Sequence, residues 1–111
     1  MATTVQKQVL INARSLIADR AHWTSGKLAC AANGRSVDWH HPRAHKWCAM
    51  GAIYRAAFDL VGNQKDAMHI GDELANNIRP RGWLPRGLPH INDTQGHAAV
   101  LAVFDKALAA A

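Results

Sequence analysis

The feature that most constrains how this chain can fold is a stripe of apolar and small side chains that begins in the segment 44–58. Its members follow one another at steps of four, three, four and three residues, and they are Trp47, Gly51, Tyr54, Phe58 and Val61. That spacing places them on one face of an α-helix. Gly51 leaves room for a neighbouring backbone to approach. The stripe predicts a central helix with Pro42 in its first turn.

The rest of the chain predicts three more helices, so we expect a mostly α, four-helix domain that occupies residues 1–111. Apolar residues recur at helical spacing from about 4 to 21, from 65 to 78, and from 93 or 94 to the end of the chain. Gly62 is the expected end of the central helix. The expected core consists of Val9, Leu16, Trp47, Tyr54, Phe58, Leu74, Val100, Leu101 and Phe104.

A small β-hairpin is expected between the first and second helices. Asn33-Gly34 separates the short segments 27–32 and 35–38, and Asn-Gly between two short segments is typical of a hairpin turn.

Composition indicates one globular, cytoplasmic domain. About half of the residues are apolar (49%) and 19% are charged, which is unlike a disordered chain. We find neither a signal sequence nor an apolar run long enough to span a membrane. Cys30 and Cys48 fit no disulfide framework, so we expect both to be reduced. The formal charge of +5 gives a weak attraction to nucleic acids and acidic proteins.

Cys48 and His97 are the side chains most suited to chemistry. Cys48 lies off the stripe, near the predicted start of the central helix, where backbone N–H groups favour a thiolate. His97 follows Asp93 by four residues, and a carboxylate can orient an imidazole as a base. The three would be nucleophile, base and orienter of a thiol hydrolase or transferase, with Asn92 as the other possible orienter. The alternative is that Cys48 and His97 are packing residues, and that Asp93 or Thr94 only caps the last helix.

A histidine cluster raises the question of a metal site. His40, His41, His45 and Cys48 fall within nine residues, and nitrogen and sulfur ligands suit zinc. Seven histidines in so short a chain make chance clustering common, and neighbouring ligands alone seldom complete a tetrahedral site. We therefore expect no metal and no cofactor.

The segment 79–90 is a predicted binding loop. It carries Arg79, Arg81 and Arg86 around Trp83, a set that offers phosphate contacts and one stacking surface. Loops of this length in a small domain are often binding elements.

Several motifs together resemble an uncharacterised domain-of-unknown-function family of small bacterial and phage proteins, over about residues 5 to 108. They are Trp47 to Ile53, Ile91-Asn92-Asp93, His97, Val100, Leu101, the pair Trp23 and Gly26, and the turn Asn33-Gly34-Arg35. The resemblance implies a shared fold and a set of positions, but no reaction. His41 and His45 depart from the family pattern, so a metal site that used them would be peculiar to this protein.

From these observations we expect a small cytoplasmic binding or accessory protein of bacterial or phage origin. It would act through protein contacts made by the Trp83 loop and the hairpin. The alternatives are the thiol enzyme and a weak nucleic-acid-binding module that uses the Arg79 to Arg86 loop. We expect no membrane partner, and the sequence leaves the partner and the oligomeric state open.

Overall fold

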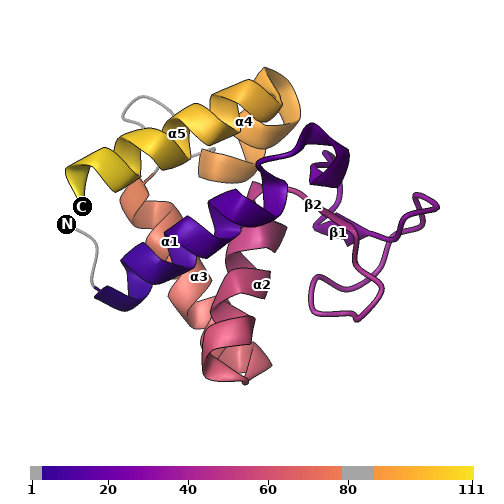
Figure 1. Cartoon of the computed structure of the whole chain (residues 1–111), viewed down its shortest axis with the longest axis horizontal. Coiled ribbons are helices and arrows are strands. Elements are labelled where there is room, and N and C mark those ends of the chain that lie inside the picture. Colours follow the sequence, from indigo (N-terminus) through magenta and orange to yellow (C-terminus); the bar gives the residue numbers. More distant parts are fainter. Residues whose placement is uncertain (1–3, 79–86) are drawn as a thin grey trace.

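The computed structural model describes residues 4–78 and 87–111. In this part of the chain there are five α-helices, one short 3-10 helix and two short strands (Figure 1). In chain order they are α1 (Thr4–Ile17), η1 (Arg20–His22), β1 (Ala29–Cys30), β2 (Lys46–Trp47), α2 (Ala49–Val61), α3 (Gln64–Ile78), α4 (Gly87–Gln95) and α5 (His97–Ala110). None of the described helices is both long enough and apolar enough to cross a membrane.

Helix α2 is the centre of the fold, as predicted, but it starts later than the sequence suggested. It packs between α1 and α3 (Figure 1). Trp47 lies in β2 and Cys48 is the N-cap, so Pro42 is not part of the first turn. The predicted end is confirmed, because Gly62 has a positive φ of 71° and its N–H bonds the Phe58 carbonyl.

A two-stranded antiparallel sheet is present, but it is not the predicted hairpin. Its register pairs Ala29 with Trp47 and Cys30 with Lys46. Across the Asn33-Gly34 turn there is only a single bridge, between Cys30 and Ser36. After this turn Val37 packs against the core and Trp39 is buried in it, but β1 forms its two-residue ladder with Lys46 and Trp47 and not with this segment. The local turn signal therefore did not decide the partner of β1.

The last helical region contains two helices where one was predicted. Gly96, with a φ of 89°, separates α4 from α5, and a glycine readily adopts that conformation. Neither Asp93 nor Thr94 is an N-cap, because both lie inside α4. The loop expected over 79–90 is in part the helix α4.

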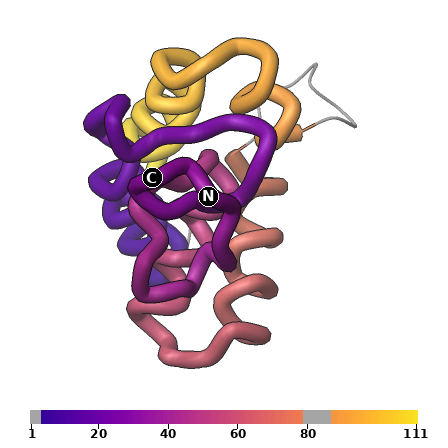
Figure 2. Tube along the Cα trace, turned by 90° about the vertical axis from the view of Figure 1, so that its right-hand side faces the viewer, coloured from indigo at the N-terminus to yellow at the C-terminus, as the bar shows by residue number. Residues whose placement is uncertain are grey.

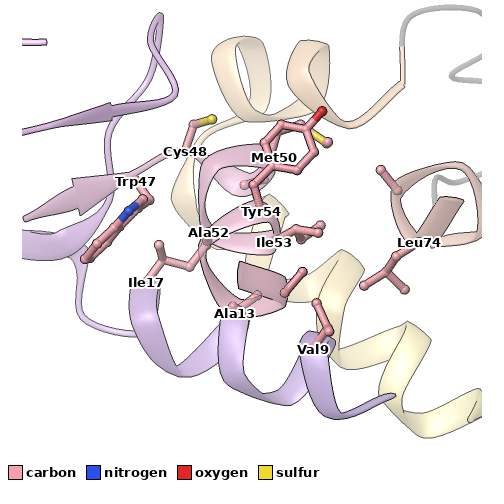
Figure 3. Close-up of a cluster of buried hydrophobic side chains, with 14 of the residues drawn as sticks. Val9, Ala13, Ile17, Trp47, Cys48, Met50, Ala52, Ile53, Tyr54 and Leu74 are labelled. Carbon is pink, nitrogen blue, oxygen red and sulfur yellow. The ribbon is translucent and has the colours of Figure 1, made fainter. Parts of the chain in front are cut away.

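Most of the predicted core is buried. Val9, Leu74, Val100 and Phe104 are fully inaccessible, and Trp47 and Tyr54 are nearly so. The other three predicted members are partly buried and pack against the same core, namely Leu16, Phe58 and Leu101. In the first helix Val5 is exposed, and Gln6 and Leu10 join Val9 on the buried face. Figure 3 shows side chains of α1, α2 and α3 meeting in this core.

Candidate functional site

Cys48 is held at the start of α2, in a more buried position than the sequence indicated. Its side chain is 6% exposed. Its backbone N–H donates to the Leu28 carbonyl at 3.2 Å, and its Sγ accepts the Gly51 N–H at 3.3 Å. The thiol therefore acts as the helix cap, a role that serine or aspartate fills more commonly.

Burial governs the acidity of this thiol. Loss of hydration raises the pKa of Cys48, and the negative charge of Asp93 adds to the increase. The N–H groups of Gly51 and Met50 act in the opposite direction but do not outweigh burial. At neutral pH Cys48 is a protonated thiol, and a protonated thiol is a poor nucleophile.

Asn92 joins three parts of the chain beside Cys48. Its Oδ1 accepts the Trp23 indole N–H at 2.7 Å and the Ala49 backbone N–H at 2.9 Å. Its Nδ2 donates to the Thr24 carbonyl and to Asp93, both at 3.1 Å. The side chain is 1% exposed, and these bonds use both amide hydrogens and both oxygen lone pairs. We call this group the Asn92 junction.

The structure does not bring Cys48, His97 and Asp93 together as a hydrogen-bonded set. The Nε2 atom of His97 lies 2.6 Å from the Ile17 carbonyl, and because a carbonyl only accepts, this nitrogen carries the proton. The carboxylate of Asp93 accepts the Gly26 N–H at 3.0 Å instead of orienting the imidazole. His97 is connected with the start of α2 through the Asn92 junction: its ring lies 5.7 Å from that of Trp23, and the Trp23 indole bonds Asn92.

The histidines near Cys48 have separate partners. The His45 ring is exposed and lies 4.6 Å from the ring of His22. His40 packs against Phe58, and the Nδ1 of His41 accepts a backbone N–H. Among residues 4–78 and 87–111, no group of three or more histidine, cysteine or acidic side chains is arranged to hold a metal ion.

A groove with a volume of about 550 Å³ lies between the start of α2, one side of α3 and the first turn of α4. Figure 3 shows two of its side chains, Met50 and Tyr54, near the start of α2. The groove is lined by Leu28, Met50, Tyr54, Met68, Asp72, Ala75, Asn76, Gly87, Leu88 and Pro89. A mostly apolar concavity with a few polar groups is the usual form of a binding site.

Two polar groups in the groove are fixed in position. The Tyr54 hydroxyl donates to Asp72 Oδ1. Burial, with the Asp72 carboxylate as its acceptor, raises the pKa of Tyr54 far above the ordinary range, so the phenol stays protonated. Gly71 makes room for the ring, because a Cβ there would lie 2.5 Å from Tyr54 Cδ1. The groove thus presents a carboxylate held by a phenol among apolar walls.

The site residues predicted from the sequence overlap only in part with the Asn92 junction and the groove. The predicted binding residues Arg79, Arg81, Trp83 and Arg86 lie outside the described residues. Asn92 was considered only as an orienter of His97. The groove had no sequence signal, because its walls come from segments that are far apart in the chain.

Comparison with known proteins adds a family. The model of a family of unknown function, DUF6197, matches residues 1–110. The chain belongs to DUF6197. This confirms the resemblance to an uncharacterised family. No curated protein and no solved structure matches the chain.

Proposed function

We propose that this DUF6197 protein is a binding protein that holds a short segment of a partner protein in the groove between α2, α3 and α4. The observation that supports the proposal is the groove itself, which combines about 550 Å³ of volume with apolar walls and a carboxylate. The partner contacts predicted for the Trp83 loop lie outside the described residues, and the groove is a second surface for the same kind of function.

The size of the groove suits a short peptide. Met68, Asp72, Ala75 and Asn76 lie at helical spacing along α3 and line one wall. Eight residues of helix separate the first from the last, which corresponds to about 12 Å. That length accommodates about two turns of a partner helix, or about four residues of an extended strand.

The chemistry of the walls defines the occupant. Met50 and Met68 are flexible, polarizable side chains, which adapt to apolar groups of different shape. Asp72 is exposed, and a carboxylate can accept bonds beyond the one from Tyr54. We therefore expect a partner segment with apolar side chains on one face and a lysine or arginine that reaches Asp72.

Selection of peptides provides the test. A library of random peptides about three helical turns long is selected against the immobilised protein and then measured against variants. Burial of one methionine side chain is worth about 1.5–3 kcal/mol. Met68→Glu is therefore expected to lower the affinity for the selected peptides by about tenfold or more. Asp72→Asn should lower the affinity for the selected peptides that carry a lysine or arginine.

Control variants keep the test specific. Val5→Glu changes another exposed apolar residue, on α1, and Asp66→Asn removes another exposed carboxylate of α3. Both should bind the peptides as the unchanged protein does. If Val5→Glu weakens binding as much as Met68→Glu, or if no peptide is selected, the groove is not the binding site.

The thiol enzyme is a second proposal with one observation in its favour. Cys48 lies at a helix N-terminus, and its Sγ receives an N–H from Gly51, an arrangement that stabilises thiolates in other proteins. Burial opposes ionisation, and the imidazole of His97 is bonded to Ile17. The alkylation experiment described in the Discussion separates the two proposals.

We also propose a cytoplasmic location and a bacterial or phage origin. The support for the location is that Cys30 and Cys48 are both free thiols, as expected in a reducing compartment. The origin rests only on the resemblance described above.

A further inference from the structure

The segment between α1 and α2 concentrates positive charge. We call residues 19–47, which contain η1, β1 and β2, the basic lobe. It has five lysines and arginines and two aspartates, a net charge of +3 in 29 residues, whereas the other 82 residues of the chain carry eight lysines and arginines and six acids, a net charge of +2. The five basic residues of the lobe are Arg20, Lys27, Arg35, Arg43 and Lys46.

The fold brings the segments that carry these residues into contact: His22 Nδ1 lies 2.8 Å from the His45 carbonyl, and the Ala31 N–H donates to the Arg35 carbonyl at 2.9 Å. Lys27 Nζ donates to the Gly34 carbonyl at 3.2 Å, next to Arg35. The strand pairing sets Lys46 opposite Cys30. Figure 1 shows the loops of this segment extending away from the helices, and in Figure 2 the same segment crosses the front of the molecule. The lobe is therefore a projecting, positively charged part of the surface.

The positive charges of the lobe are not neutralised by acids. The ion pairs among the described residues that use arginine are those of Arg14 and Arg55, both outside the lobe. Within the lobe, Asp19 caps η1 by accepting the Ala21 N–H, and Asp38 lies 4.0 Å from His40. Arg20, Arg35 and Arg43 are all exposed. They are available to an external anion.

We infer that the basic lobe docks on the phosphate backbone of a nucleic acid. The lobe and the peptide groove share Leu28, but none of the five basic residues lines the groove, and the inference goes beyond the proposed function. Among residues 19–47, Leu28 is the one large apolar side chain that is exposed. The lobe therefore lacks the set of apolar side chains that would insert into a membrane. Trp39 is 4% exposed, and the Trp23 indole bonds Asn92. Trp47, the third tryptophan of the lobe, is 7% exposed. With all three rings engaged in the fold, binding depends on charge and not on stacking with bases.

Salt dependence of DNA binding by the full chain is the test. A fluorescein-labelled duplex is titrated and its anisotropy measured at several salt concentrations. Four or five phosphate contacts would weaken binding about 100- to 500-fold between about 50 and 200 mM salt, because each contact contributes about −0.9 to the slope of log K against log salt. The lobe variant Arg20→Glu, Arg35→Glu, Arg43→Glu should lose at least tenfold in affinity, and its slope should shrink by about 2 to 3.

A matched variant separates the lobe from the net charge. Lys7→Glu, Lys65→Glu, Lys106→Glu makes the same charge change at three exposed positions elsewhere and should change affinity much less. Circular dichroism checks that both variants are folded. The inference is overturned if this control loses as much affinity as the lobe variant. It is also overturned if the lobe variant binds DNA normally, or if the protein binds phosphatidylserine vesicles and not DNA.

Discussion

Replacement of Asn92 by leucine should destabilise the fold severely, although the two side chains have similar size. The change leaves the Trp23 indole N–H and the Ala49 N–H without their acceptor and the Thr24 carbonyl without its donor. A buried polar group without a partner costs about 1–3 kcal/mol. Two such donors alone give about 2–6 kcal/mol, a large part of the 5–15 kcal/mol by which a domain is ordinarily stable.

Urea denaturation followed by tryptophan fluorescence measures this loss. With a denaturant slope of about 2 kcal/mol per molar, a loss of 4 kcal/mol lowers the unfolding midpoint by about 2 M. Asn76→Leu is the control, because the Asn76 side chain is exposed and its replacement should change the midpoint little. If the Asn92→Leu midpoint stays within about 0.3 M of the unchanged protein, the hydrogen bonds of the Asn92 junction do not hold these segments together.

Three further predictions follow from single contacts. Gly51→Ala should cost about 3 kcal/mol or more, because its Cβ would lie 1.9 Å from a backbone oxygen of the segment before β1; unchanged thermal stability would contradict this close approach. Cys48, with its pKa raised by burial, should react with iodoacetamide only slowly at neutral pH, and His97→Ala should leave the rate unchanged; fast alkylation that depends on His97 would favour the thiol enzyme. Arg14 lowers the pKa of Asp105, so their ion pair stabilises the fold above the ordinary carboxyl pKa of about 3.9 and is lost as the pH falls through the lowered value. The small difference in melting temperature between the unchanged protein and Asp105→Asn should therefore disappear in acid, and a difference that grows in acid would refute the assignment.

The sequence predicted those parts of the fold that depend on local patterns. The central helix, its end at Gly62 and the span of α3 follow from helical spacing and a glycine cap. The predicted start of α2 was wrong. The apolar stripe extends back to Trp47, but this residue pairs with Ala29 and lies in β2. The position predicted for Cys48, on the flank of the helix and off the apolar stripe, was therefore wrong, because this residue is the N-cap and lies before the first turn.

The sites were harder to predict, because they join segments far apart in the chain. Asn92 bonds groups that lie more than forty residues away. Such partners leave no periodic signal in one sequence. For the same reason the pairing of His97 with Ile17 and of Tyr54 with Asp72 could not be anticipated. Helix α4 was missed because Gly87 and Pro89 in its first turn were assigned to the predicted loop, while the expected last helix ran from residue 93 or 94 through Gly96.

The groove proposal is tested most directly by the methyl NMR signals of its two methionines. The protein has three methionines, two of which, Met50 and Met68, line the groove. They can be labelled with ¹³C at the methyl group, and Met68→Leu assigns one signal. If a peptide from the selection occupies the groove, the Met50 and Met68 signals should shift together and saturate with the binding constant measured independently. If the peptide binds and neither signal moves, the partner segment lies elsewhere and the central proposal is wrong.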